Sequence, residues 1–377
     1  MSNVPHLRFP EFDGEWEEST IGEQFDLYSG NTPSRLNKEH FNGSINWISS
    51  GELKEHYIKD SKEKISEEAA KNLKMLPKGT FVIAIYGLEA EGVRGTGSIL
   101  LNNATISQAC MAFSHKAEIT NEFLYSWYKK HGNVIGIRYA QGTKQQNLSY
   151  DILEKFKISY PAIQEQEKLN RFISLLDKRI TTQNKIIEDL KKLKSAIRKK
   201  VFVSLKEEHT ESLEINQLLT YEQPTAYIVT NDEYSTDTTL IPVLTANKGF
   251  VLGYTDEDFS IYQKGECIIF DDFTMDAKYV SFPFKVKSSA IKILTAKPNV
   301  NLRFMFEYLS YLELKSEEHK RHYISEIASL VVELPSKEMQ NKIASLMTSL
   351  DNKLALEENT KVKYEDEKQY QLSQMFI

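Results

Sequence analysis

The stretch Tyr160-Pro161-Ala162-Ile163-Gln164-Glu165-Gln166-Glu167-Lys168-Leu169, which continues to Phe202, returns later in the same chain. The second copy begins at Leu334-Pro335 and runs to Ile377. A shift of 174 positions aligns the two copies without a gap, as 335 − 161 = 174 shows for the two prolines. The chain is therefore built on an internal repeat. The further matches are Gln166 with Gln340, Lys168 with Lys342, Leu176-Asp177 with Leu350-Asp351, Lys194 with Lys368, and Phe202 with Phe376.

The first copy has a seven-residue period. Its apolar positions alternate four and three residues apart, which is the spacing of a coiled-coil seam. About 40 helical residues at 1.5 Å each predict a rod of roughly 60 Å. Pro161 suits the turn just before such a helix. The apolar seam positions are Leu169, Ile173, Leu176, Ile180, Ile187, Leu190, Ile197 and Val201, with Gln183 and Lys194 as the two polar ones.

The second copy keeps the seam at Ile343, Met347, Leu350 and Leu354 and then becomes polar. A long heptad helix must bury its seam against a partner, so two in one chain are expected to pair with each other. The first copy is basic and the second ends in the acidic run Glu365-Asp366-Glu367. In an antiparallel pair this run is expected near Arg171, Lys178 and Arg179. Taken alone, each charge run is more simply interpreted as a solvated helix face.

The totals limit the class of protein. A chain of 377 residues with 41% hydrophobic content can bury two cores. No apolar run has transmembrane length, and no charged-then-apolar leader is present, which predicts a cytoplasmic protein without a membrane partner. Cys110 and Cys267 lack metal or redox spacing and are expected to be buried thiols. With a net charge of −6, DNA binding would require locally concentrated cations or a second subunit.

The chain reads as domain, rod, domain, rod. The turn and strand of residues 262–270 have the outline of residues 76–84, and residues 302–308 resemble the helix that starts near Thr120. We therefore predict an α+β protein: two mixed α/β domains separated by two long antiparallel coiled-coil helices, with a pseudo-twofold internal repeat. The expected bounds are 1–159 for the first domain, 160–206 for the first helix, 207–333 for the second domain and 334–377 for the second helix.

One stretch of the first domain, Lys129 to Tyr150, contains cations and no acid before Tyr150. It includes Gly142-Thr143-Lys144-Gln145-Gln146-Asn147, a loop of amides and hydroxyls. Amides beside cations are the residue types that contact phosphates and base edges. An ordinary solvated loop would have the same composition, and composition alone does not separate the two interpretations.

Catalytic and metal motifs are weak or missing. Residues 92–97 are rich in glycine, but without a strand–helix context they favour a hairpin or a DNA-facing turn over a cofactor site. The tetrapeptide of adenine methyltransferases (Asn/Asp-Pro-Pro-aromatic) does not occur. Asp271-Asp272 with Asp276 and Lys278 superficially matches a metal-dependent nuclease, a short pattern that is common by chance. We predict no catalytic residue and no metal site.

Taken together, these pieces resemble the specificity (S) subunit of type I restriction–modification systems over nearly the whole chain. The entry Tyr160–Gln166 is similar to the proline-containing entry of the family's conserved helices. The second entry, Leu334–Gln340, departs from the pattern because it lacks the usual Glu-Gln pair. The other stretches that carry the resemblance are Leu7–Phe12 with Gly14–Trp16, Gly30–Ser34, Trp47–Leu53, Gly142–Ser149, Tyr221–Thr225, Pro242–Ala246 and Phe270–Thr274.

The resemblance implies a DNA-specificity subunit without catalysis of its own. Each domain would be a target-recognition domain reading one half of a bipartite double-stranded DNA site, and the paired helices would set the gap. Methyltransferase (M) subunits, two in number, would dock on the helices and carry S-adenosylmethionine. Motor-nuclease (R) subunits would add ATP with Mg, so that this chain binds no cofactor itself.

The same resemblance guides the choice of DNA contacts. Asp271 and Asp272 could accept from cytosine amino groups or hold a loop, and we favour the loop. The candidates in the first domain are Arg35, Lys38, Ser49, Ser50, Tyr86, Arg94, Lys144, Gln145 and Asn147. Those in the second are Thr245, Asn247, Lys248, Thr274, Lys278, Arg321 and Tyr323.

Two hypotheses of other classes compete. A stand-alone nuclease would need Asp272, Asp276 and Lys278 around one metal ion. A coiled-coil adaptor would bind protein partners without any preference for a DNA sequence.

Overall fold

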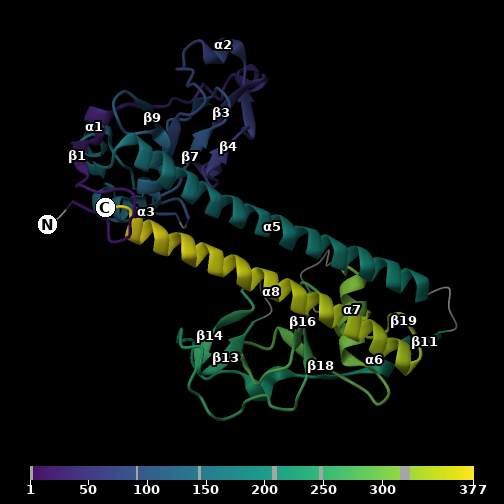
Figure 1. Cartoon of the computed structure of the whole chain (residues 1–377). Helices are drawn as coiled ribbons and strands as arrows, with labels where there is room; N and C mark the ends of the chain where they lie inside the picture. Colours follow the sequence, from purple (N-terminus) through teal and green to yellow (C-terminus); the bar gives the residue numbers. More distant parts are fainter. Residues whose placement is uncertain (1–2, 91, 143–145, 206–209, 246–248, 315–322) are drawn as a thin grey trace. The chain divides into compact units, whose positions relative to one another are not determined.

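The computed structural model describes residues 3–90, 92–142, 146–205, 210–245, 249–314 and 323–377. Its internal contacts divide the chain into two compact units. Unit 1 is Met1–Asn184 with Asn359–Ile377, and unit 2 is Lys185–Glu358. Each unit therefore holds one mixed domain together with part of each of two long helices, α5 (Ile163–Leu205) and α8 (Lys337–Met375) (Figure 1).

Unit 1 is a mixed α/β domain. Its strands are β1 (Glu17–Thr20), β2 (Phe25–Ser29), β3 (Ile45–Ile48), β4 (Tyr57–Ile58), β5 (Glu63–Ile65), β6 (Phe81–Ala84), β7 (Gly97–Leu100), β8 (Thr105–Ile106), β9 (Cys110–His115) and β10 (Lys157–Tyr160). Its helical segments other than the long helices are α1 (Ile21–Gln24), η1 (Lys38–Phe41), η2 (Ser50–Glu52), α2 (Glu67–Ala70), α3 (Asn121–Tyr139) and α4 (Tyr150–Leu153).

Unit 2 has a similar composition. Its strands are β11 (Glu211–Glu214), β12 (Leu219–Glu222), β13 (Ile241–Leu244), β14 (Val251–Thr255), β15 (Cys267–Asp271), β16 (Ala277–Val280), β17 (Lys285–Val286), β18 (Ile291–Ala296) and β19 (Val331–Leu334). Its helical segments are α6 (Ile215–Leu218), η3 (Pro224–Tyr227), α7 (Leu302–Tyr311) and a π-helical turn, η4 (Tyr323–Ile327).

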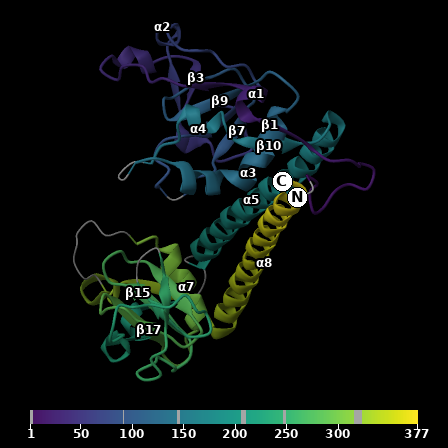
Figure 2. The same cartoon turned by 90° about the vertical axis from the view of Figure 1, so that its left-hand side faces the viewer.

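The two units have matching sheet topologies, except that unit 1 has one more edge strand, β4, in its main sheet. The main sheet has the order β2-β9-β6-β7-β4 in unit 1 and β12-β18-β15-β16 in unit 2. A three-stranded sheet follows the same rule, with β5-β3-β8 matching β14-β13-β17, and β1-β10 matches β11-β19. In both units a single helix, α3 or α7, follows the last strand of the main sheet (Figure 2). The α+β class and the internal repeat of domains are thereby confirmed.

The central strands β6 and β15 form for the same reason. Each is an apolar run with every side chain buried, as expected for a strand covered on both faces. Each follows a Lys-Gly turn in which Gly79 or Gly265 has a positive φ, +87° and +99°, that glycine adopts without strain. Cys110 and Cys267 are both buried, as predicted.

The repeated glutamines attach each domain to a long helix. In unit 1 the Gln166 Oε1 accepts the backbone N–H of Thr120, the N-cap of α3, at 3.0 Å. In unit 2 the Gln340 Oε1 accepts the N–H of Asn301, the N-cap of α7, at 2.8 Å. Both Nε2 groups donate 2.9 Å bonds to the carbonyl of the entry proline five residues earlier. The same residue therefore joins helix entry and domain in both units.

The repeat also places one ion pair in each unit. In unit 1 Asp177 of α5 binds Lys368 of α8 at 2.5 Å, and in unit 2 Asp351 of α8 binds Lys194 of α5 at 2.5 Å. The shift of 174 positions relates the two aspartates (351 − 177 = 174) and the two lysines (368 − 194 = 174). Within unit 1, Asp177 of α5 meets Lys368 of α8, and Arg179, two residues later in α5, lies over the ring of Tyr364, four residues earlier in α8. The helices are antiparallel within unit 1.

The seam positions of both helices lie inward. The most buried are Leu169, Ile173, Leu176, Ile187, Ile343 and Met347, and Ile180, Leu190, Ile197, Val201, Leu350 and Leu354 are half-buried. The expected contact of the acidic run with basic residues differs in detail. Arg179 contacts the Tyr364 ring, 5.5 Å from its centroid, while Glu365 pairs with Lys361 of its own helix at 3.6 Å. No helix in the described ranges combines the length and the apolar character needed to cross a membrane.

Two phenylalanines that the repeat relates pack against a domain helix, one in each unit. Phe376 packs on Phe123 of α3 with ring centroids 5.2 Å apart, and Phe202 packs on Phe304 of α7 at 5.5 Å. Both phenylalanines are buried. Each unit therefore takes an apolar plug from the helix that ends in it.

Replacing Phe376 with Ala tests this plug. Phe376 is 2% exposed, and removing such a buried ring costs about 3–5 kcal/mol of the free energy of unfolding. Tyr370→Ala on the same helix is the control, because Tyr370 is 59% exposed and surface changes stay within about 0.5 kcal/mol. Urea denaturation of both variants measures the difference, and equal stability of the two would contradict the assignment.

Candidate nucleic-acid interface

The glycine-rich residues of unit 1 form the connection between β6 and β7. These strands pair antiparallel, so the connection is a hairpin, as predicted. It lies directly on α3, because a Cβ added to Gly132 would be 2.8 Å from the Gly95 Cα. One turn further along, Gly136 faces the aliphatic part of Arg94. Glycines on both sides thus allow the hairpin to approach the helix backbone closely.

This hairpin holds a second loop, the one predicted to contact DNA. Arg94 donates from Nη2 to the Gln146 Oε1 at 2.9 Å, and the Gln146 N–H donates to the Glu89 carboxylate at 2.8 Å. The Gln146 carbonyl accepts the N–H of Leu88 at 3.1 Å. Gln146 is absent from the candidates chosen from the sequence, although it lies within the amide-rich loop. Arg94, chosen as a DNA contact, is a support for this loop.

A hollow of about 480 Å³ adjoins the two loops. It brings together two predicted residues, Tyr86 and Asn147, whose backbones are bridged. Tyr86 and Tyr150 are exposed at its rim and can stack on bases, while amides and hydroxyls can meet base edges. The residues that line it are Ser29, Ile85, Tyr86, Met111, Gln141, Gly142, Asn147, Leu148, Ser149 and Tyr150.

The other candidates of unit 1 do not line this hollow. Arg35 is exposed, pairs with Glu63 at 2.8 Å and lies over the Phe41 ring. Lys38 is exposed at the start of η1. The Ser49 hydroxyl is already engaged, since it donates to Glu52 at 2.6 Å, and Ser50 is half-buried beside it. Lys144 and Gln145 lie outside the described residues.

Two basic residues of the acid-free stretch, Lys130 and His131, contact the C-terminal end of α8 and the residues after it. Lys130 donates to the Phe376 carbonyl at 2.5 Å, and the His131 Nε2 lies 2.9 Å from the Ile377 carbonyl. Burial lowers the pKa of His131 to about 4, so the neutral ring donates there. Burial likewise lowers the pKa of Lys129 to about 8. The composition of this stretch therefore reflects contacts to the end of a helix, where unpaired carbonyls favour donors and cations.

Unit 2 has its own hollow, of about 690 Å³, between α7 and the β15–β16 turn. The predicted Thr274 and Lys278 line it together with Arg198 of α5. Lys278 pairs with Asp276 at 3.0 Å. Thr245 is half-buried, and its N–H donates to the Phe250 carbonyl. Asn247, Lys248 and Arg321 lie outside the described residues.

The choice of Tyr323 as a DNA contact was wrong. Its side chain is 1% exposed and packs edge-on against Phe270 and Tyr221, with centroids 5.5 and 5.6 Å away. A ring buried in this way cannot meet a base. Tyr323 begins a π-helical turn, and its ring points into the core of unit 2.

Asp271 and Asp272 hold a loop, as favoured from the sequence. Asp271 accepts the N–H groups of Phe273 and Thr274 at 2.8 and 3.1 Å. Asp272 accepts the Tyr323 N–H at 2.8 Å and pairs with Lys292 at 3.2 Å, both side chains being 1% exposed. Both carboxylate oxygens of Asp272 therefore bind partners within the core. Over the described ranges, no three His, Cys, Asp or Glu side chains are grouped as a metal site would require.

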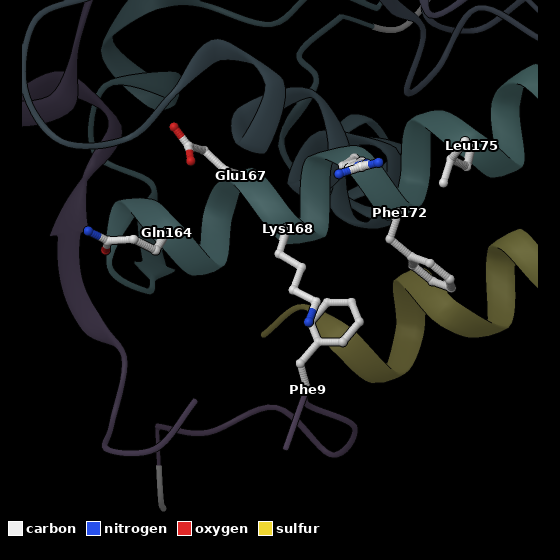
Figure 3. Close-up of a pocket in the computed structure, with 7 residues that line it drawn as sticks. Phe9, Gln164, Glu167, Lys168, Phe172 and Leu175 are labelled. Carbon is white, nitrogen blue, oxygen red and sulfur yellow. The ribbon is translucent and has the colours of Figure 1, made fainter. Parts of the chain in front are cut away.

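A third hollow, of about 540 Å³, lies on a face of α5 that the seam does not occupy. Figure 3 shows Phe9 reaching from the N-terminal segment to Lys168 on the helix. The Lys168 ammonium lies 4.6 Å from the Phe9 ring centroid, and Phe172 meets the same ring edge-on at 6.0 Å. Leu175 is 55% exposed at the far end. This groove combines apolar side chains with charges of both signs, since Glu167 lines it and Lys168 pairs with Glu11, and it is suited to a protein partner.

A buried imidazole joins the domain of unit 1 to both helices. His56 lies 3.0 Å from Glu122 of α3 and 2.9 Å from Asp177 of α5, which also binds Lys368 of α8. Its ring is stacked between Tyr57 and Tyr125, with centroids 4.0 and 3.9 Å away. Burial opposes the charge, but the bonds to Asp177 and Glu122 outweigh it and raise the pKa of His56.

Unit 2 has a guanidinium at the corresponding place. Arg303 of α7 binds Asp351 of α8 and the fully buried Glu307. Glu307 also pairs with Arg198 at 2.7 Å and Lys194 at 3.5 Å, both from α5. In both units, therefore, a cation of the domain and a lysine of a long helix share one aspartate.

The chain matches the family model of the type I restriction modification DNA specificity domain over residues 13–192 and 207–365. It is 40% identical over 146 residues to the specificity subunit of the EcoR124I/EcoR124II enzyme of Escherichia coli, covering 37% of this chain and 36% of that protein. It is 27% identical over 221 residues to the MjaIX specificity subunit of Methanocaldococcus jannaschii, covering 57% of this chain and 50% of that protein. The chain thus spans half or less of these two curated relatives.

A solved structure has the same fold. The crystal structure of the S subunit of a type I restriction-modification system from M. genitalium matches with a TM-score of 0.64 and 17% identity. The match covers 99% of both chains. At this identity the likeness concerns the fold alone.

The imidazole at the joint predicts a pH effect. A histidine in an unfolded chain has a pKa of about 6.5. Since the folded pKa is raised, its stabilising effect is complete below that value and is lost as the pH rises through the folded pKa. The free energy of unfolding, measured from about pH 6 to about pH 9, should fall more steeply in the wild type than in His56→Arg, whose charge persists.

His56→Gln is the matched control for this comparison, since it removes the charge at every pH. It should lose stability mainly at the acid end. Lys129 titrates in all three proteins and cancels in their differences. Identical pH slopes for the wild type and His56→Arg would show that His56 is not charged in the folded protein.

Proposed function

Because this chain belongs to the type I restriction modification DNA specificity family, we propose that it is the non-catalytic subunit that selects the DNA site for such a complex. Unit 1 and unit 2 would each read one half of a bipartite double-stranded site. The observation that carries this proposal is the repetition of one domain topology, attached to α5 and α8 through the same glutamine and the same Asp–Lys pair. Two domains of similar topology in one chain are what recognition of a DNA site in two halves would require.

The long helices would set the gap between the half-sites. Two readers joined by stiff helices gain affinity from effective concentration only where the DNA presents both half-sites at a matching distance. Support for this role comes from the ion pairs and the buried seam that join α5 to α8 in each unit.

Partners would supply the chemistry. We place S-adenosylmethionine on methyltransferase subunits, two of them, and ATP with Mg on motor-nuclease subunits, with no cofactor on this chain. The groove at Phe9, Lys168 and Leu175 of α5 is a docking candidate for a methyltransferase subunit. With a net charge of −6, the chain would rely on its partners for much of the positive surface that DNA requires. We also propose that the complex works in the cytoplasm.

Co-expression with the cognate methyltransferase subunit, followed by mapping of N6-methyladenine on a plasmid, tests the proposal. We expect methylation confined to one motif of two short half-sites with a constant gap. A stable complex without sequence-confined methylation would contradict site selection and favour the adaptor. Cleavage of DNA by the purified chain with a divalent ion alone would favour the nuclease.

Lengthening both helices tests the gap. Seven residues inserted in α5 after Asn184 and seven in α8 after Glu358 keep the heptad period and add roughly 10 Å to each helix. The mapped gap should lengthen by about 3 base pairs, at 3.4 Å each, with both half-sites unchanged. An unchanged gap in a complex that still methylates would refute the role of the helices. Insertion into α5 alone is the control and should prevent assembly.

A further inference from the structure

Gln146 of unit 1 has an amide whose orientation is determined by a neighbour. Its Oε1 is occupied by the Arg94 guanidinium at 2.9 Å, and its backbone is bonded on both sides, to Glu89 and Leu88. Among the described residues its Nε2 has no hydrogen-bond partner, and it is not one of the buried side-chain atoms left unpaired. The side chain therefore presents two N–H donors, while its oxygen is already bonded to Arg94.

Arg94 is itself held in place. Its aliphatic part lies on Gly136 of α3, where an added Cβ would be 3.2 Å from the Arg94 Cγ. The hairpin that carries it touches α3 again at Gly132. An amide supported in this way loses little further freedom when it binds, which is the condition for precise discrimination.

The free donors select among the bases. In the major groove guanine presents two adjacent acceptors, O6 and N7. Cytosine presents a donor, adenine presents a donor beside its N7, and thymine presents a methyl group beside its O4. The paired contact of glutamine to adenine needs the side-chain oxygen as acceptor, and adenine would have to share that oxygen with Arg94, whereas guanine needs only the donors. Guanine is therefore the base that matches this amide.

We propose that Gln146, oriented by Arg94, reads a guanine in the half-site recognised by unit 1. Gln146 makes the contact, and Arg94 is a positioning residue that orients the amide and competes with adenine for its oxygen. The inference rests on the proposed function and adds one base identity to it. The hollow with Tyr86 and Tyr150 at its rim lies next to Gln146 along the chain and would receive the neighbouring part of the half-site.

The experiment maps N6-methyladenine motifs for the co-expressed complex with wild-type, Gln146→Glu, Arg94→Met or Arg94→Lys chains. Gln146→Glu replaces donors with acceptors, so methylation of the wild-type site should fall about 10- to 100-fold and one guanine of the first half-site should change to cytosine. Arg94→Met keeps the aliphatic contact but frees the oxygen, so the same position should accept adenine as well as guanine. Arg94→Lys retains a donor and should preserve guanine.

The second half-site and the gap are internal controls for folding, because unit 2 would read that half-site in the same complex. Gln369→Glu makes the same charge change on an exposed position of α8 and should leave the motif unaltered. A bipartite wild-type motif whose first half-site stays the same in Gln146→Glu would overturn the inference and leave the proposed function intact. A wild-type complex without any motif would overturn both.

Discussion

An aspartate and a lysine bound across an apolar seam organise each half of this molecule. Asp177 with Lys368 and Asp351 with Lys194 join α5 to α8. Polar groups in a seam lower stability relative to apolar ones but restrict the register in which two helices can pair. Here each aspartate also binds a cation of the domain, His56 in unit 1 and Arg303 in unit 2. Register and domain attachment therefore depend on the same carboxylate.

The two joints are alike in layout and different in chemistry. Unit 2 uses a guanidinium at this place, whereas unit 1 uses an imidazole whose pKa is raised, against the cost of burial, by its bonds to Asp177 and Glu122. The ring of His56 is stacked between two tyrosines, while the Arg303 guanidinium lies near the rings of Tyr279 and Phe306. The two units therefore have the same layout, but the joint between the domain and the long helices should respond to pH more strongly in unit 1 than in unit 2.

The helical framework could be predicted from the sequence because its signals are local and periodic. Heptad spacing identified the buried seam, and the gap-free shift aligned Asp177 with Asp351 and Lys194 with Lys368 without predicting that the aspartates bind the lysines. The seam of the second copy becomes polar after Leu354, and only the antiparallel pairing shows that Lys368, like Lys194 of the first copy, has an acid opposite. The repeated Lys-Gly turns before β6 and β15 likewise predicted that the two domains are similar.

The candidate interface was harder to predict because composition does not tell which way a side chain points. The composition of residues 129–131 suggested a basic surface. Instead, Lys129 donates to the Gly95 carbonyl of the β6–β7 hairpin, and Lys130 and His131 contact the residues that follow α8. Tyr323 lies among polar residues but is buried by a π-helical turn. Gln146 was passed over because its distinction comes from Arg94, fifty-two residues away in the chain.

The last turns of α8 complete unit 1, whose other elements are all made much earlier in synthesis. Until residues 359–377 emerge from the ribosome, Phe123 and the seam of α5 in unit 1 have no cover from α8. Contacts between residues so distant in sequence form slowly, and uncovered apolar surface invites aggregation. During synthesis, unit 1 therefore lacks its α8 residues while unit 2 is being made. A chaperone or an early partner would protect the uncovered surface during that interval.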